Sequence, residues 1–174
     1  MRKPEALSVS IGFFGAVDTY VTATLILVPV WVTFIAWASF VSVGGGRRGW
    51  VQSLACNFTG IVIASLTLLA ITLTSAGAVG AAVLVGIGSA AMVQASKLPL
   101  LAPNPAIVWG FASLVGTTFA TGVPITTVAL NNPLLVAALA MFLGASFGRA
   151  AEALGQVLEK GKQAAAMGEA PRPT

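Results

Sequence analysis

The sequence predicts an all-α, polytopic membrane protein with six transmembrane helices, arranged as an inverted repeat of two three-helix halves. Composition is the first observation: of 174 residues, 57% are hydrophobic and 8% are charged, against roughly 25% charged residues in a soluble domain. The second observation is the distribution of the basic residues along the chain, and the third is an internal repeat. Three long stretches without Lys, Arg, Asp or Glu, 19–46, 49–96 and 98–148, each exceed the roughly 20 residues that cross a bilayer as helix.

The first two spans are predicted over 7–27 and 30–43. The N-terminal MRKPEALSV has the basic start of a signal peptide, but no cleavage site and polar mature domain follow, so we expect a retained span. Pro29 divides the apolar run, since proline disturbs a helix interior and favours a first turn. The second span is short, roughly 21 Å, so it either thins the membrane locally or is buried among other helices.

Four more spans follow a polar loop, Gly44 to Gly49, after which Trp50 suits the membrane interface. Turn residues and prolines place these spans at 51–74, 78–96, 106–121 and 133–150, with Pro133 as a favourable first helical residue. Residues 1–150 are thus predicted to form one transmembrane domain. The tail, 151–174, is predicted to be cytoplasmic, helical at first and disordered at its end.

The basic residues support six spans independently. With a cytoplasmic N-terminus, the cytoplasmic segments are 1–6, 44–50, 97–105 and 149 onward, and all nine Lys and Arg residues fall there. Lys and Arg concentrate in cytoplasmic loops. The pattern therefore predicts that the N- and C-termini are both cytoplasmic.

An internal repeat appears at an offset of 74 residues, where PVWVTFIAWASFVSV from Pro29 aligns with PNPAIVWGFASLVGT from Pro103. Ser39 aligns with Ser113, and in the flanks Asn57 aligns with Asn131. Because three spans is an odd number, the second half would be inverted. Inverted repeats with short or proline-interrupted spans in matching positions point to a solute path near the bilayer midplane. The alternative is a symmetric bundle without any path.

Asp18 is the only acidic residue inside a predicted span. A charged residue there costs roughly 2.5 to 3.5 kcal/mol and is by default a functional hypothesis. The chain has no His, and no Lys or Arg lies within a span at the depth of Asp18. Asp18 must then be protonated, hydrated, or hydrogen-bonded to groups such as Thr22, Asn57 or Gln94. It either belongs to a water-lined path or a proton or cation site, or joins helices as a protonated acid.

The predicted path lies between the second and fifth spans. Its candidate lining residues are Asp18, Ser39, Ser113, Asn57, Asn131 and Gln94, and its candidate constriction is formed by Phe34, Trp37, Trp109 and Phe111. Uncharged hydroxyls and amides suit a small neutral solute or a partly dehydrated cation better than an anion.

Small residues recur every four positions in three spans, and such stripes allow close helix packing. The stripes are Ala78, Ala82, Gly86, Ala90 and Gln94, then Ala112, Gly116 and Ala120, then Ala140, Gly144 and Gly148. The first stripe predicts that the fourth span lies at the centre of the bundle or at a subunit contact.

Signals for enzymes, metals, cofactors and nucleic acid are missing from the sequence. There is no His, no pair of nucleophile and base, and no metal-ligand spacing. The single Cys56 is expected to be a small packing residue. The net charge of +4 is explained by the cytoplasmic loops rather than by a basic soluble face.

The chain resembles the YcdZ-like bacterial inner-membrane proteins, a family of unknown function. The resemblance covers about 7–150 and rests on WVTFIAWASF from Trp31, GGGRRG from Gly44, and the proline-led second copy through TTFA from Thr117. It implies a multi-pass protein of the bacterial inner (plasma) membrane and no particular activity. Asp18 is not expected to be a shared feature of that family.

These observations predict a small-solute channel or transporter subunit, most simply a channel within a homo-oligomer in the lipid bilayer. The alternative is a non-conducting structural or accessory membrane protein of a larger complex.

Overall fold

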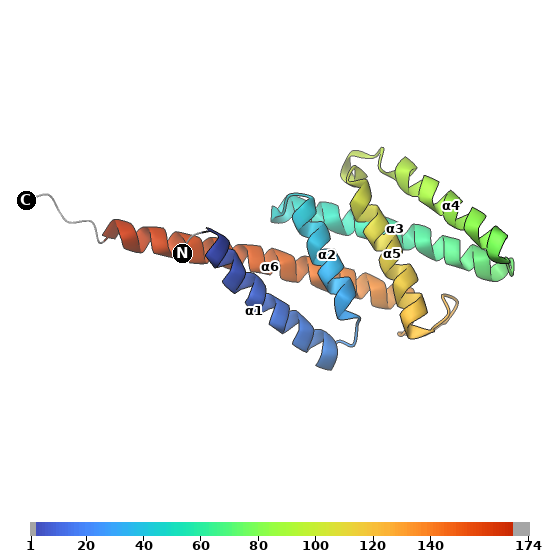
Figure 1. The fold of residues 1–174 in the computed structure, drawn as a ribbon, viewed down its shortest axis with the longest axis horizontal. Coiled ribbons are helices and arrows are strands. Elements are labelled where there is room, and N and C mark those ends of the chain that lie inside the picture. Colours follow the sequence, from blue (N-terminus) through green and yellow to red (C-terminus); the bar gives the residue numbers. More distant parts are fainter. Residues whose placement is uncertain (1–2, 169–174) are drawn as a thin grey trace, which may run out of the picture.

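The fold is all-helical throughout residues 3–168, the part of the chain that the computed structural model describes (Figure 1). Its helices are α1 (Lys3–Thr24), α2 (Val30–Ser42), α3 (Gly46–Leu73), α4 (Ala78–Ala95), the 3-10 helix η1 (Pro99–Leu101), α5 (Asn104–Thr121) and α6 (Pro133–Gly168). The predicted all-α class is confirmed. The end of the tail, which was predicted to be disordered, lies outside the described residues.

Four of the described helices are long and apolar enough to cross a membrane. They are Pro4–Thr24, Gly46–Leu73, Ala78–Ala95 and Pro133–Lys160. The short helix α2 has 13 residues, about 20 Å, and together with α5 it falls outside this group. The two helices that are not evident spans are therefore the two that carry the sequence repeat.

The loop predicted over Gly44 to Gly49 is shorter than expected, because α3 begins at Gly46 and includes both Arg47 and Arg48. The reversal is made by a glycine turn, which is Gly44, Gly45 and Gly46, with φ of 99°, 66° and 67°. Only glycine adopts such angles without steric cost. Three glycines therefore complete the turn in the space where the sequence suggested six residues.

Proline and glycine mark other helix ends. Pro29 precedes α2 with φ of −63°, Pro105 lies in the first turn of α5, and α6 begins at Pro133. Gly122 ends α5 in the left-handed conformation. These are the positions at which a fixed φ or a positive φ is favourable.

The helices pack in an interleaved order: α2 lies against α6, α5 against α3, α1 along α6 and α4 along α3, with α3 and α6 in contact (Figure 1). Three glycines permit the closest crossings. A Cβ on Gly144 would overlap the backbone carbonyl of Thr33, one on Gly60 would overlap that of Ile107, and one on Gly110 would overlap that of Asn57. Each half of the chain thus packs mainly against the other half.

The fourth helix is peripheral, so the first of its two expected positions, the centre of the bundle, is wrong, and the second, a subunit contact, stays a prediction. Only Gly88 and Met92 of α4 are buried. Every member of its small-residue stripe is exposed: Ala78, Ala82, Gly86, Ala90 and Gln94. The stripe on α6 is buried as expected for packing, whereas Ala112 and Ala120 of the α5 stripe are exposed. The buried residues of α4, Gly88 and Met92, lie on the face opposite the stripe.

The sixth helix continues without a break from the predicted span into the predicted tail, as one helix of 36 residues. At 1.5 Å per residue it measures about 54 Å, well beyond a hydrocarbon core of about 30 Å.

Candidate functional site

Asp18 and Thr33 form a hydrogen-bonded pair between α1 and α2. Both residues are fully buried, and the Thr33 Oγ1 lies 2.6 Å from Asp18 Oδ2. The same hydroxyl lies 2.7 Å from the carbonyl oxygen of Val30. A hydroxyl has one proton, so both contacts are satisfied together when Asp18 is protonated and donates to Thr33, which then donates to Val30.

The partner of the Asp18 carboxyl was not found from the sequence. The Thr22 hydroxyl, one turn further along α1, donates instead to the backbone carbonyl of Asp18, and Gln94 is exposed on α4. Thr33 lies 15 residues from Asp18 on another helix, and nothing in its sequence context separates it from the many other threonines of the chain.

A second polar group, which we term the buried polar cluster, comprises Ser39 of α2, Asn57 of α3 and Ser113 of α5. All three residues are fully buried. The Ser39 hydroxyl donates to Asn57 Oδ1 at 3.0 Å. Ser113 is one turn beyond Gly110, whose Cα packs against the backbone of Asn57. Ser39 and Asn57 therefore join α2 to α3, and Ser113 lies one turn along α5 from the contact of Gly110 with Asn57.

Several of these polar atoms have no hydrogen-bond partner among the described residues. They are Asp18 Oδ1, Asn57 Nδ2, Ser113 Oγ and, one turn after Ser113, Thr117 Oγ1. A buried polar group without a partner costs about 1 to 3 kcal/mol, and such groups in a folded protein require an explanation. The interior faces of α1, α3 and α5 therefore carry hydrogen-bond donors and acceptors that no described residue uses.

The remaining predicted path residues lie elsewhere. Asn131 is exposed on the connector between α5 and α6. Its neighbour Asn132, which is not among the predicted path residues, organises this connector. Its Nδ2 donates to the carbonyls of Ile125 and Thr127, and its Oδ1 accepts from the Leu134 backbone N–H. Asn132 thus caps α6, a role typical of Asn before a helix.

The four aromatic residues of the predicted constriction divide between two helices. On α2, Phe34 and Trp37 stack with centroids 6.1 Å apart, but Phe34 is 45% exposed and Trp37 is buried. On α5, Trp109 and Phe111 are half-buried. Another aromatic residue makes the contact between these helices, since the ring of Trp31 packs against Gly116.

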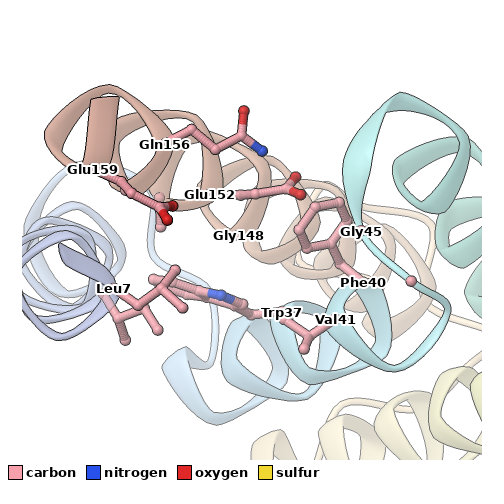
Figure 2. Close-up of a pocket in the computed structure, with 13 residues that line it drawn as sticks. Leu7, Trp37, Phe40, Val41, Gly45, Gly148, Glu152, Gln156 and Glu159 are labelled. Atoms are coloured by element: carbon pink, nitrogen blue, oxygen red, sulfur yellow. The ribbon is translucent and has the colours of Figure 1, made fainter. Parts of the chain in front are cut away.

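A cavity of about 380 Å³ lies between α1, α2 and α6 beside the glycine turn, and Trp37 is the one predicted constriction residue that lines it (Figure 2). Apolar side chains line one side, and polar side chains of α6 line the other. The apolar residues include Leu7, Ile11, Trp37, Phe40 and Val41, and the polar ones are Glu152, Gln156 and Glu159. This cavity had no signal in the sequence, because its lining combines three segments far apart in the chain.

The Glu152 carboxylate closes one end of this cavity. Its Oε2 accepts a hydrogen bond from the backbone N–H of Gly46 at 2.8 Å and lies 3.5 Å from the Arg149 guanidinium. The carboxylate therefore occupies the N-terminus of α3, where the helix dipole favours negative charge.

The apolar helices, the buried polar pairs between them and the four helices long enough to cross a bilayer define a helical membrane protein. A family model described as a protein of unknown function, DUF1097, matches residues 8–156. The chain belongs to this family. Comparisons with curated proteins and with solved structures gave no match.

Proposed function

We propose that this protein is a small-solute channel or transporter subunit built as an inverted repeat, with its path between α2 and α5. The observation that carries the proposal is the set of fully buried polar side chains at this place, several of them without partners. In a lipid environment an unused buried donor or acceptor is costly. Selection for passage of a polar solute explains why they are retained.

The burial pattern of α2 and α5 supports the repeat. Five buried positions of α2 correspond, at the offset of 74 residues, to buried positions of α5. They are Val32 and Ala106, Thr33 and Ile107, Ala36 and Gly110, Ser39 and Ser113, and Phe40 and Leu114. The positions that are buried in both helices include polar as well as apolar residues. The agreement in burial therefore does not depend on the chain being rich in alanine and valine.

The third helices of the two halves match at a different offset. Gly60 of α3 and Gly144 of α6 make equivalent backbone crossings, with Ile107 and Thr33 respectively, and those two partners are themselves 74 residues apart. The offset between the glycines is 84 residues. Asn57 then corresponds to Met141 and not to Asn131, because the connector before α6 is longer than the glycine turn before α3.

The packing order also supports the repeat. When α1, α2 and α3 are exchanged with α4, α5 and α6, the contact of α2 with α6 becomes that of α5 with α3, and the contact of α1 with α6 becomes that of α4 with α3. In the first pair of helices, Asp18 would correspond to Met92, which packs with Ile107 as Asp18 does with Thr33. The acidic pair would thus be a feature of one half only.

The solute class that we propose is a small neutral polar molecule or a monovalent cation. The cluster offers hydroxyl and amide groups, which can replace water around such a solute. No Lys, Arg or His side chain of the described residues lies in this part of the interior, so the cluster provides no countercharge for an anion.

Flux into proteoliposomes tests the proposal, with urea, ammonium, glycerol, water and monovalent cations as solutes. We expect flux above that of empty vesicles, strongly reduced by Ser113→Leu, which would place an apolar side chain in the cluster. The matched control is Ser89→Leu, because Ser89 is exposed on α4. Absence of flux for all solutes from folded wild-type protein would refute the proposal.

The exposed stripe of α4 favours the second candidate, a structural or accessory subunit that conducts nothing. Small residues on a lipid-facing helix allow another helix to approach closely, and the Gly86 position has free space around it. The same stripe could equally form the contact between identical subunits of a channel. Isolation of a stable hetero-complex together with the failure of the flux test would favour the accessory function.

The location that we propose is the bacterial inner membrane, with both termini in the cytoplasm and a YcdZ-like identity within the family. The hydrogen bond of Glu152 to Gly46 supports the topology, because it holds Arg47, Arg48 and Arg149 at one end of the bundle, as the preference of basic residues for the cytoplasmic side requires. Reporter fusions at the C-terminus and in the connector 122–132 test it. Activity of a cytoplasmic reporter in both fusions would contradict six spans.

A further inference from the structure

The cavity beside the glycine turn has the composition of a ligand site. Its volume of about 380 Å³ lies in the range of about 300 to 1,000 Å³ that small-molecule pockets occupy, and such pockets combine an apolar lining with few polar groups. We propose that this cavity binds an organic cation, namely an ammonium group carried on a short apolar body. This inference is independent of the proposed solute path.

The apolar part of the cavity accommodates the body of such a ligand. Leu7 and Ile11 of α1 and Val41 of α2 line it together with the rings of Trp37 and Phe40. Opposite them α6 presents the small residues Gly148, Ala151 and Gly155, and Trp37 and Phe40 pack directly against Gly148. An alkyl or aryl group would bury its surface here at a gain of about 25 cal/mol per Å².

The polar part of the cavity carries negative charge. Glu152 and Glu159 are both on α6, two turns apart, with Gln156 between them. Glu152 is already engaged by the Gly46 N–H and by Arg149, so its charge is largely compensated. Among the described residues Glu159 has no hydrogen bond or ion pair, so it presents a carboxylate that none of them engages.

The aromatic ring of Trp37 adds to this preference for a cation. Figure 2 shows the Glu159 carboxylate on the α6 side of the cavity, facing Leu7 and the indole ring of Trp37 on the opposite side. A cation over an indole face gains about 0.5 to 2 kcal/mol. An ammonium between a carboxylate and an indole is therefore favoured over a neutral or anionic group of the same shape.

Two sources could supply this chemistry: a water-soluble amine, or the amine of a lipid headgroup such as phosphatidylethanolamine. Both present an ammonium next to apolar surface. The experiment distinguishes them by the lipid that surrounds the protein.

Binding of n-butylammonium to the full chain in nanodiscs of phosphatidylglycerol, measured by calorimetry, tests the proposal. We expect saturable binding, with n-butanol and butyrate binding at least tenfold more weakly. Glu159→Gln should weaken the ammonium about tenfold, as the loss of one charge-assisted contact predicts. Val41→Trp should reduce binding by filling the cavity, whereas Val79→Trp, on the exposed face of α4, should leave it unchanged.

The charge reversal Glu159→Lys provides a second readout, because it should favour butyrate over n-butylammonium. Weaker amine binding in nanodiscs that contain phosphatidylethanolamine would identify the lipid amine as the occupant, and equal binding would identify a soluble amine. The proposal is overturned if folded wild-type protein does not bind n-butylammonium or if n-butanol binds equally well. It is also overturned if Glu159→Gln and Val41→Trp both bind n-butylammonium like the wild type.

Discussion

The backbone N–H of Gly46 donates a hydrogen bond of 2.8 Å to Oε2 of Glu152, which is 106 residues further along the chain. The positive φ angles of the glycine turn present this N–H to α6. The Gly45 Cα also lies against the carboxylate, since a Cβ there would be 3.0 Å from Glu152 Oε1. One side chain of the last helix thus fixes the start of the third.

Replacement of Glu152 by Ala should therefore lower the free energy of unfolding by about 1 to 3 kcal/mol, the value of a hydrogen bond to a charged group. Glu159→Ala is the matched control, because Glu159 makes no such bond among the described residues, and it should change stability little. Unfolding in mixed micelles followed by circular dichroism measures both. Equal stability of the two variants would mean that water replaces Glu152 at this helix terminus.

The glycines at the helix crossings should tolerate no side chain. Gly60→Ala and Gly144→Ala each place a methyl group on a backbone carbonyl of the facing helix, which requires the helices to separate. We expect losses of several kcal/mol, or no folded protein, as for overpacking of a dense core. Gly86→Ala, where a Cβ meets nothing within 4 Å, should be neutral or stabilising because Ala favours helix. Thermal unfolding in detergent compares the three.

The pair of Asp18 and Thr33 should respond differently to replacement of each partner. Thr33→Val leaves a buried carboxyl without its partner and should cost about 1 to 3 kcal/mol. Asp18→Asn keeps a neutral donor in place, so it should cost less than Thr33→Val if Asp18 is protonated. Infrared spectroscopy of the wild type should show a protonated carboxyl band that Asp18→Asn removes. A band of an ionised carboxylate in its place would contradict this protonation state.

Ser39 and Ser113 occupy corresponding positions but differ in their hydrogen bonds. Ser39→Ala removes the partner of Asn57 Oδ1 and should destabilise the protein by about 1 to 3 kcal/mol. Ser113→Ala removes a hydroxyl without a partner, so it should be neutral or slightly stabilising. Chemical unfolding of the two variants compares them directly. A large loss on Ser113→Ala would show that its hydroxyl is already bonded, for example to water.

The exposed stripe of α4 should control association. Gly86→Leu introduces a large side chain at a position with free space in the single chain, so the fold should be retained while close helix contacts between subunits are blocked. We expect a smaller oligomer by light scattering in detergent, and an unchanged circular dichroism spectrum. Val79→Leu, also exposed on α4, is the control. An unchanged oligomer would place the subunit contact elsewhere.

The helices of this protein were well predicted because their signals are local. Pro29 and Pro133 fix helix starts by their own backbone geometry, and long uncharged runs fix the apolar class. The start of α3 was misjudged by several residues, because the positive φ angles of the glycine turn allow a much tighter reversal than a polar loop of that composition suggests.

The site was predicted only in part, for a physical reason that Asn57 and Asn131 illustrate. Both were matched at one constant offset, but the connector before α6 is long, so Asn131 lies on a loop and Asn57 lies in the core. Of the predicted path residues, Ser39 and Asn57 are joined by a hydrogen bond, and Ser113 is buried on α5 without a partner among the described residues. The partner of Asp18 and the cavity between α1, α2 and α6 depend on which helices touch, and that order is set by glycine crossings between distant segments.

The interleaved packing has a consequence for how the chain reaches its native state during synthesis. The buried face of α2 is covered mainly by α6, which leaves the ribosome after α1 to α5. Until α6 has been translated, the residues of α2 that α6 covers, such as Thr33, would therefore remain exposed to lipid or water. Truncation before α6 should therefore not yield a folded first half, and the quality-control machinery of the cell would encounter an exposed α2 in every unfinished molecule.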